Sequence, residues 1–249
     1  MESTVKALVL KVGRFREVDA WVRLFSPSKG LFTAFAFGAS VSRRRFCGCL
    51  SPFNLLQAKI KTPRAGGYTY LMETVLLAGH QGLRQGPERL GMAVNCLKFL
   101  EKAHAGQAGS QTAYALLLGT LEALAECPCP SPLVPLLFRA RLAFDQGLRP
   151  DFVACYQCGK NLDQAGAAVF LVQEGRLLCP DCRGRVGGPG ISLGVKSLEF
   201  LRAVSHDSPR VWSGLIPDSR ARGECALALE QFVQYHVGLS WNNGSFARN

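Results

Sequence analysis

The first third of the chain alternates short apolar runs with clusters of turn-forming residues. Runs rich in β-branched, aliphatic and aromatic residues cover residues 5–12, 20–25, 31–37, 53–60 and 68–76. Glycine, proline and serine are concentrated between them, at residues 27–30, 38–40 and 63–67. This pattern predicts five short strands. Because closure removes the exposed edges of so short a sheet, we expect a five-stranded OB-fold barrel, although an SH3-like barrel would give a similar pattern.

Beyond His80 the apolar residues recur at helical spacing. One-sided apolar faces within residues 90–100, 114–125 and 133–144 predict three amphipathic helices, and two more are expected at about 195–205 and 220–237. A cysteine-rich segment lies between these two groups. The predicted class is therefore α+β, with a barrel domain at residues 1–79 and a helical domain in two parts, 80–150 and 191–249. The cysteine-rich element at 151–190 would be an insertion between those two parts.

Four of the ten cysteines form two Cys-x-x-Cys pairs. Cys155 and Cys158 make the first pair, Cys179 and Cys182 the second, and twenty residues separate the pairs. This is at the upper edge of the usual spacing for a four-cysteine zinc site, and four thiolates at tetrahedral positions suit Zn²⁺. Because protein sulfur would fill all four positions, the expected role of this one ion is structural.

The segment between the two pairs predicts a hairpin that turns near residues 174–175, which makes the insertion zinc-ribbon-like. So small an element needs the metal as its core. The other six cysteines lack partners at metal-ligand spacing, and Cys96 and Cys225 lie on apolar helical faces as core residues.

The beginning of the chain lacks the pattern of a signal peptide. It is acidic where a signal peptide is basic, and its apolar run ends at Lys11. No charge-free apolar stretch of about 18 residues follows, so no membrane span and no membrane partner is expected. These observations predict a cytoplasmic protein, in which thiols stay reduced.

Sequence motifs of common enzymes are also missing. The chain contains no Gly-x-Ser-x-Gly elbow, no phosphate-binding loop and no dinucleotide fingerprint. None of its four histidines is followed two positions later by glutamate, as a zinc deaminase would require. The sequence therefore favours a binding protein that is not an enzyme.

Positive charge is concentrated in the predicted barrel. Of a formal net charge of +11, residues 1–79 contribute 12 lysines and arginines against four acidic residues. The rest of the composition, 48% hydrophobic and 19% charged, is that of a globular protein and excludes fibrous and disordered classes. A basic module of this kind favours a polyanionic partner such as nucleic acid.

Three groups of cations are the candidate DNA contacts. Adjacent guanidiniums in a loop can match phosphates in several geometries, and alternate lysines of one strand share a face. If that face coincides with the one that carries Tyr68 and Tyr70, bases could stack on the rings beside the cations, an arrangement that single-strand-binding proteins use. Core positions for the two tyrosines are equally compatible with the sequence. The candidate cations are Arg43, Arg44 and Arg45 in the loop, Lys59 and Lys61 on the fourth strand, and Lys11, Arg14 and Arg16 near the first turn.

Short motifs across this region are similar to those of a known family. They are Glu17 and Asp19 before a strand, Phe25, Gly30, the pair Gly38-Ala39 before a basic loop, and Gly48-x-Leu50-x-Pro52-Phe53. In these residues, and in the order of barrel, helices and four-cysteine insertion, the chain resembles the RecO family of bacterial recombination mediators. The resemblance implies an N-terminal OB domain, a helical domain and a zinc-ribbon-like element.

It also implies a function in DNA repair and homologous recombination, in the RecF pathway and the SOS response to DNA damage. Members bind single- and double-stranded DNA, anneal complementary strands and, with RecR, help RecA to load onto DNA coated by single-strand-binding protein. The resemblance places residues 43–45 in the family's basic loop and implies a nucleoid-associated protein. It further implies that the helical domain docks the C-terminal tail of single-strand-binding protein, a role with which Arg139 and Arg141 are compatible.

One residue and one segment depart from the family pattern. Phe37 stands where many members have a lysine, and residues 240–249 form a polar tail with one cation where many members are basic. The barrel is therefore expected to carry more of the DNA binding. The alternative is a zinc-ribbon adaptor whose main partner is a protein and which has no functional DNA binding; a zinc-dependent nucleic-acid enzyme is disfavoured by the four-sulfur site.

Overall fold

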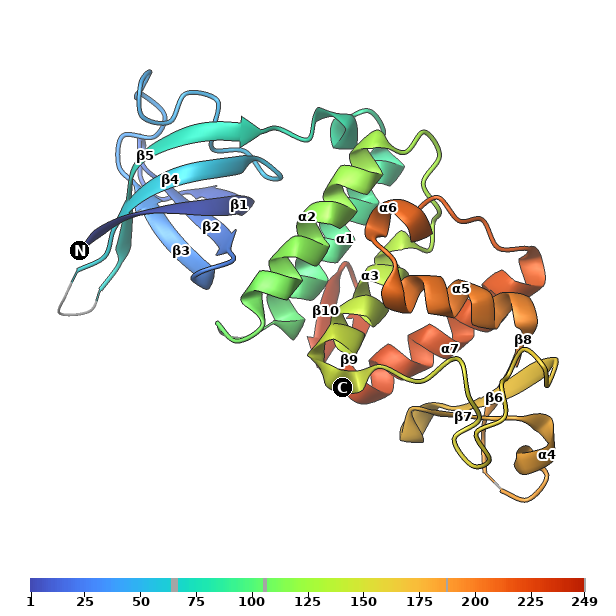
Figure 1. Cartoon of the computed structure of the whole chain (residues 1–249). Coiled ribbons are helices and arrows are strands. Elements are labelled where there is room, and N and C mark those ends of the chain that lie inside the picture. Colours follow the sequence, from blue (N-terminus) through green and yellow to red (C-terminus); the bar gives the residue numbers. More distant parts are fainter. Residues whose placement is uncertain (64–66, 105–106, 187, 249) are drawn as a thin grey trace.

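The computed structural model describes residues 1–63, 67–104, 107–186 and 188–248. Five strands come first, then the helices; a second, cysteine-rich group of strands is inserted between two sets of helices in the sequence and lies at the end of the molecule remote from the barrel (Figure 1). Most of the turn expected at residues 63–67 lies outside the described residues. The mixed α+β class is confirmed.

The N-terminal strands form a closed barrel in the order β1-β2-β3-β5-β4. The predicted five-stranded barrel is therefore confirmed. Each strand lies within a few residues of its expected range: β1 is Glu2–Arg14, β2 Ala20–Ser26, β3 Gly30–Ala36, β4 Leu55–Lys61 and β5 Thr69–Ala78.

The barrel closes around its own apolar interior. Along β4, buried and exposed side chains alternate, so Leu56, Ala58 and Ile60 point inward. Phe46 and Cys49, from the connection between β3 and β4, belong to the same buried cluster. This connection therefore packs into the barrel interior rather than extending freely into solvent.

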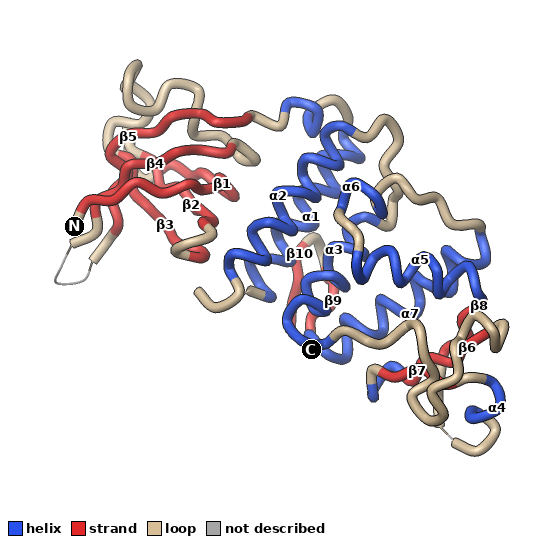
Figure 2. Tube along the Cα trace, viewed as in Figure 1, coloured by secondary structure: helices blue, strands red, loops and turns tan. Residues whose placement is uncertain are grey.

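Helices make up most of the remaining chain (Figure 2). They are η1 Gln81–Arg84, α1 Pro87–Ala103, α2 Ser110–Glu126, α3 Val134–Ala143 with a π-helical turn Phe144–Leu148, α5 Val195–His206, α6 Pro209–Trp212 and α7 Ser219–Val237. All five predicted helices are present. None of the helices in the described part of the chain is long and apolar enough to cross a membrane.

The cysteine-rich insertion contains the expected hairpin. Strands β6 Ala167–Leu171 and β7 Arg176–Leu178 are joined by the 3₁₀ turn η3 Val172–Glu174, with Gly175 in the left-handed region at φ +65°. A third strand, β8 Ile191–Gly194, pairs with β6 and runs directly into α5. A short helix, α4 Pro180–Arg183, follows the hairpin. The strand β8 was not predicted, because four residues give too short an alternation.

The mostly polar residues 239–248 fold back as a hairpin. Strands β9 Leu239–Asn242 and β10 Ser245–Arg248 pair as a hairpin. Phe246 is buried and lies edge-on to Phe99 of α1, with ring centroids 5.1 Å apart. This polar segment is therefore an ordered hairpin that packs on α1.

A second buried cluster runs through the rest of the molecule. It includes Phe25 on the outer side of the barrel, whose ring is 5.7 Å from that of Tyr114 on α2. It continues through the helices to Phe170 of β6, which meets Phe232 of α7 at 5.9 Å. The cysteine-rich element consequently shares its core with the helices.

Candidate functional site

The four predicted ligand cysteines converge on one point. The sulfur atoms of Cys155, Cys158, Cys179 and Cys182 all lie within 4.8 Å of one another, and those of Cys158 and Cys179 are 3.8 Å apart. A regular tetrahedron with metal–sulfur bonds of about 2.3 Å has sulfur–sulfur edges of about 3.8 Å. The cluster therefore has the size and the donor set that a tetrahedral metal ion needs, and these four residues would hold it.

Local backbone geometry brings each pair of thiols together. Gly159 lies in the left-handed region at φ +72°, and its N–H donates to the Cys155 carbonyl at 2.9 Å, which closes the first turn. The second pair sits at the start of α4, where Pro180 takes the first helical position, which needs no N–H donor. The Cys179 N–H donates to the Cys155 sulfur at 3.3 Å and so links the two turns.

The surroundings of the thiols favour the thiolate form of Cys155 and the protonated form of Cys182. Burial opposes ionisation of Cys155, but three backbone N–H groups, led by that of Cys179, donate to its sulfur, and its pKa falls to about 6. The pKa of Cys182 rises to about 12, because its thiol donates to Cys158 and because it is desolvated. The group thus carries protons that a metal would displace, since thiolates are the ligands.

Contacts from α5 fix the cluster against the helices. Arg202 donates to both carboxylate oxygens of Asp163, at 2.7 and 2.8 Å, and to the Phe152 carbonyl at 3.0 Å. Lys160, which follows the first cysteine pair, and Asp181, which lies between the two cysteines of the second pair, form an ion pair at 3.4 Å. The four-cysteine cluster is therefore held firmly within the fold.

The predicted basic loop lies between β3 and β4. The Arg45 guanidinium donates to the Phe37 carbonyl at 2.8 Å, and the Arg45 carbonyl accepts from the N–H and hydroxyl of Thr74. Arg43 and Arg44 are exposed, and their guanidiniums form no ion pair with any residue that the structure describes. Two of the three arginines are thus available to a ligand, while Arg45 also anchors the loop.

The two lysines of β4 share an outward face, as their spacing predicts. Lys59 is 3.3 Å from the carboxylate of Glu2 and stands opposite Glu73 on β5, so part of its charge is neutralised. Lys61 stands opposite Tyr70, which places a cation and a ring on one side of the sheet.

The cations near the first turn lie next to aromatic rings. The Lys11 ammonium is 5.6 Å from the ring centroid of Trp21, and the Arg16 guanidinium is 5.3 Å from that of Phe15. Arg14 is exposed at the end of β1. All eight predicted cations therefore lie on the strands of the barrel or in its loops, and their roles as DNA contacts stay predictions.

Aromatic side chains occupy the outer surface between these cations. Tyr68 is 68% exposed and contacts Phe35, which in turn contacts Phe15, each pair with ring centroids 5.0 Å apart. Neither Tyr68 nor Tyr70 is buried in the barrel, so a core position is excluded for both. We call this surface the aromatic face, and its residues are Phe15, Trp21, Phe35, Phe37, Tyr68 and Tyr70.

Sequence reasoning missed Phe15, Trp21 and Phe35. The signal for Trp21 was the alternation in β2, where Val22 and Leu24 are buried and Trp21 faces outward. Gly13 stands opposite Trp21, and a Cβ at Gly13 would lie 2.3 Å from the indole. The ring thus lies directly over the glycine backbone.

The two arginines whose sequence positions are compatible with docking an acidic tail make contacts within the helical domain. Arg139 is only 8% exposed, lies 3.5 Å from Glu230 and stacks on Phe246 at 5.5 Å. Arg141 donates to the carbonyls of Val204 and Asp207. Both guanidiniums therefore hold the helical domain together, and these contacts leave them poorly placed to receive an acidic tail.

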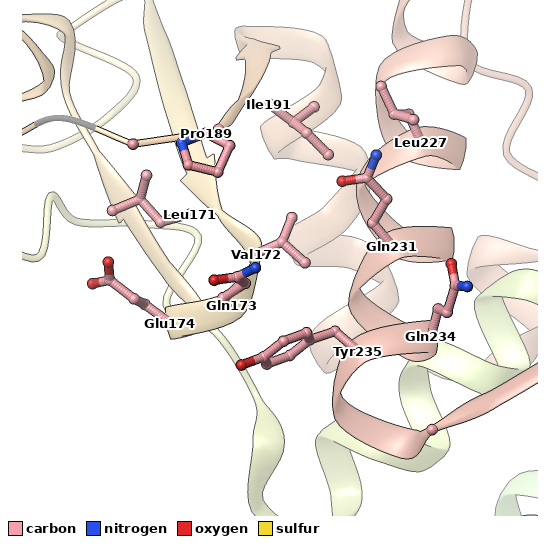
Figure 3. Close-up of a pocket in the computed structure, with 13 residues that line it drawn as sticks. Leu171, Val172, Gln173, Glu174, Pro189, Ile191, Leu227, Gln231, Gln234 and Tyr235 are labelled. Atoms are coloured by element: carbon pink, nitrogen blue, oxygen red, sulfur yellow. The ribbon is translucent and has the colours of Figure 1, made fainter. Parts of the chain in front are cut away.

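A cleft of about 750 Å³ separates the turn after β6 from α7 (Figure 3). Gln231, Gln234 and Tyr235 of α7 face Val172 and Glu174 across it. No cation lines this cleft among the described residues, so it does not suit a polyanion.

Comparison with known proteins gives a consistent picture. The family model described as recombination protein O, N terminal, matches residues 1–79, and the C-terminal model of the same family matches residues 84–244. A DNA repair protein RecO from Solidesulfovibrio magneticus is 46% identical over the whole of both chains. One from Nitratidesulfovibrio vulgaris is 45% identical, also over both full chains, and one from an Anaeromyxobacter species is 32% identical over 93% of this chain and 90% of its own. Because the two family models together match residues 1–79 and 84–244 and these relatives match the chain over nearly its whole length, the chain belongs to the recombination protein O family.

Proposed function

We propose that the protein mediates recombinational DNA repair: it binds single- and double-stranded DNA, anneals complementary strands and, with RecR, helps RecA to load onto DNA coated by single-strand-binding protein. The observation that carries the proposal is the aromatic face of a closed barrel bordered by cations. Membership of a family whose relatives are named DNA repair proteins supports it. The proposal assigns DNA binding to a domain of residues 1–79, with helical parts at 80–150 and 191–249 and the metal element at 151–190.

The rings and the cations on the barrel surface each suit a different part of a nucleic acid. Rings such as Trp21 and Tyr68 offer π-faces on which unpaired bases stack without sequence preference. Arg43, Arg44 and Lys61 offer cations that replace the counterions of the phosphates. Stacking serves single strands, whereas the charge serves both single strands and duplexes.

Annealing by such a surface needs no bond making or breaking. Two complementary strands repel each other through their phosphates, and a cationic protein surface that binds both lowers this repulsion. The proposed role is therefore not that of an enzyme. We also propose that the four cysteines hold Zn²⁺, which supplies a structural cross-link, since four sulfur ligands leave no position for a reactant.

The proposed partners beyond DNA are RecR, the C-terminal tail of single-strand-binding protein and, indirectly, RecA. These assignments rest on the family, and the location that they imply is the nucleoid in the cytoplasm.

Replacing Arg43 and Arg44 with alanine is expected to weaken DNA binding and to flatten its salt dependence, by about 0.7 in the logarithmic slope for each lost single-strand phosphate contact. Fluorescence anisotropy of a labelled oligonucleotide across a salt series measures both. The matched control is the double change Arg185→Ala and Arg222→Ala, which removes two exposed cations outside the barrel. An unchanged slope in the folded loop variant would exclude the loop from the DNA contact.

Replacing Trp21 with leucine is expected to weaken single-strand binding by about 1–3 kcal/mol, the usual contribution of one stacked base, and to affect duplex binding far less. Paired titrations with single-stranded and duplex oligonucleotides measure the difference. Trp241→Leu is the control, because Trp241 is a partly exposed tryptophan of the C-terminal hairpin. Equal losses on both DNA forms would show that Trp21 acts through the fold and not through stacking.

If the purified wild-type protein binds no oligonucleotide at low salt, the mediator proposal fails. The zinc-ribbon adaptor, whose partner is a protein, then takes its place.

A further inference from the structure

Two cysteines lie in the turn that follows the basic loop, and neither the proposed DNA contacts nor the four-cysteine cluster accounts for them. Cys47 is exposed, whereas Cys49 is only 6% exposed. The Cys49 N–H donates to the Phe46 carbonyl at 3.0 Å, which closes a four-residue turn. Gly48 occupies the third position with φ +66°, the left-handed value that a type II turn requires there. We call residues 46–49 the dithiol turn.

The dithiol turn is held on the barrel through its second cysteine. Cys49 belongs, with Phe46, to the apolar interior of the barrel. Its sulfur lies 3.4 Å from the Cys47 carbonyl oxygen and 3.9 Å from that of Thr74 on β5. The buried Asn54 side chain donates to the Cys49 carbonyl at 2.9 Å. The position of Cys49 therefore fixes the turn against the barrel.

The same strand also fixes the basic loop. The Arg45 carbonyl accepts from the N–H and the hydroxyl of Thr74, at 2.9 and 3.1 Å. The Cys49 sulfur lies beside the carbonyl of that same threonine. Thr74 is thus a common anchor for the loop and for the dithiol turn, so a change at Cys49 acts on the segment that carries the exposed Arg43 and Arg44.

We infer that Cys47 and Cys49 form a peroxide-responsive dithiol that regulates DNA binding by the basic loop. Redox-responsive pairs combine an exposed thiol, which meets the oxidant, with a neighbouring thiol that resolves the oxidised product. Cys47 is the exposed member, and Cys49 is the resolving member. The inference rests on the proposed function and deepens it, because it assigns a regulation to the same DNA site.

The oxidation takes two steps and consumes one molecule of hydrogen peroxide. In the first step the Cys47 sulfur attacks one peroxide oxygen, which keeps its hydrogen; an S–O bond forms, the O–O bond breaks, and the other oxygen leaves as water with the thiol proton. In the second step the Cys49 sulfur attacks the Cys47 sulfur; the disulfide bond forms, the S–O bond breaks, and the hydroxyl leaves as water with the Cys49 proton. Two thiols are thereby oxidised while peroxide is reduced to two water molecules. An added dithiol reverses the change by thiol–disulfide exchange.

The disulfide requires a change in the dithiol turn. Bonded sulfur atoms are about 2.05 Å apart, and the attached Cβ atoms are about 3.8 Å apart. In the reduced protein, however, the Cys47 side chain is exposed while that of Cys49 is packed in the barrel interior. We expect bond formation to draw Cys49 out of the apolar cluster and away from Thr74. The basic loop then loses an anchor, and its cations no longer match the phosphates in a fixed arrangement.

A peptide map shows whether the bond forms. Full-length protein is treated with an equimolar amount of hydrogen peroxide, its free thiols are blocked, and its tryptic peptides are analysed by mass spectrometry. Cleavage after Arg45 and Lys59 leaves both cysteines in one peptide. This peptide is expected to escape blocking and to be lighter by two hydrogen atoms than the reduced form. A peptide that still accepts two blocking groups after peroxide treatment would overturn the inference.

Fluorescence anisotropy shows whether the bond regulates DNA binding. The oxidised wild-type protein is expected to bind a single-stranded oligonucleotide about tenfold more weakly, equivalent to 1.4 kcal/mol, and to recover with dithiothreitol. Cys47→Ser is expected to abolish this response. Cys129→Ser is the matched control and should keep it, because Cys129 is an exposed member of the second Cys-x-Cys pair, outside the barrel. A full response in the Cys47→Ser protein would overturn the inference, since another thiol, such as one of the four clustered cysteines, would then cause it.

The double change Arg43→Ala and Arg44→Ala connects the dithiol with the loop. In this variant peroxide is expected to change DNA affinity by less than about twofold, because the cations on which the dithiol acts are absent. A tenfold response in this variant would contradict regulation through the loop. A mapped disulfide with unaltered DNA affinity in the wild type would overturn this inference alone. Reduced wild-type protein that binds no oligonucleotide would end the mediator proposal and, with it, the regulation inferred here, whatever the peptide map shows.

Discussion

Replacing Cys158 with serine is expected to abolish stoichiometric metal binding and to lower the free energy of unfolding by roughly 3–5 kcal/mol, because a bound metal would cross-link two turns that lie far apart in the sequence. The effect should reach beyond the insertion, since Cys155, Cys179 and Cys182 belong to the same buried cluster as the helices. Elemental analysis of the purified protein gives the metal content, and thermal unfolding followed by circular dichroism gives the stability.

Cys47→Ser is the matched control for this change, because Cys47 is exposed and lies outside the four-sulfur cluster. It should leave metal content and unfolding midpoint unaltered. A Cys158→Ser protein that kept one full equivalent of zinc and its midpoint would show that the ligand set is wrong.

Phe232→Ala is expected to lower the free energy of unfolding by about 3–5 kcal/mol, the usual result of removing a fully buried phenylalanine ring. Phe232 is 0% exposed and contacts Phe144 of the helical part and Phe170 of the cysteine-rich part, at 5.5 and 5.9 Å. Its loss leaves a cavity where the two parts meet. Urea denaturation measures the change.

Leu227→Ala serves as its control, because Leu227 lies on the same helix and is 50% exposed. A surface change of this kind shifts stability by about 0.5 kcal/mol or less. If the two variants proved equally stable, Phe232 would not hold the insertion to the helices.

The sequence predicted the structure best where a short local pattern is enough to determine it. The alternation of apolar and polar residues predicts β4. The spacing of the two Cys-x-x-Cys pairs predicts a four-cysteine cluster, and the fold brings these cysteines together. The C-terminal hairpin escaped prediction although Asn243-Gly244 is a strong turn signal, with both residues at positive φ. Its flanking strands are only four residues long. Because most residues of this segment are polar, its sequence does not indicate that Phe246 is buried.

The aromatic face was harder to predict, because its rings become neighbours only when strands that are separate in the sequence pair with one another. Trp21 and Phe35 are neighbours only through the register of β2 and β3, and Phe35 meets Tyr70 only through the parallel pairing of β3 with β5. Likewise, Arg139 is an ordinary helix residue in the sequence. Its burial depends on Glu230 and Phe246, which lie about a hundred residues further along the chain.

Helix α7 also determines the order in which the chain can fold during synthesis. It packs against α3, from which the whole cysteine-rich insertion separates it in sequence, so the helical core stays incomplete until nearly the whole chain has emerged. The barrel, by contrast, has its own interior and all its strands by Ala78, and N-terminal units fold first on the ribosome. In a nascent chain the cationic barrel is therefore complete, close to messenger and ribosomal RNA, before the four clustered cysteines have been synthesised.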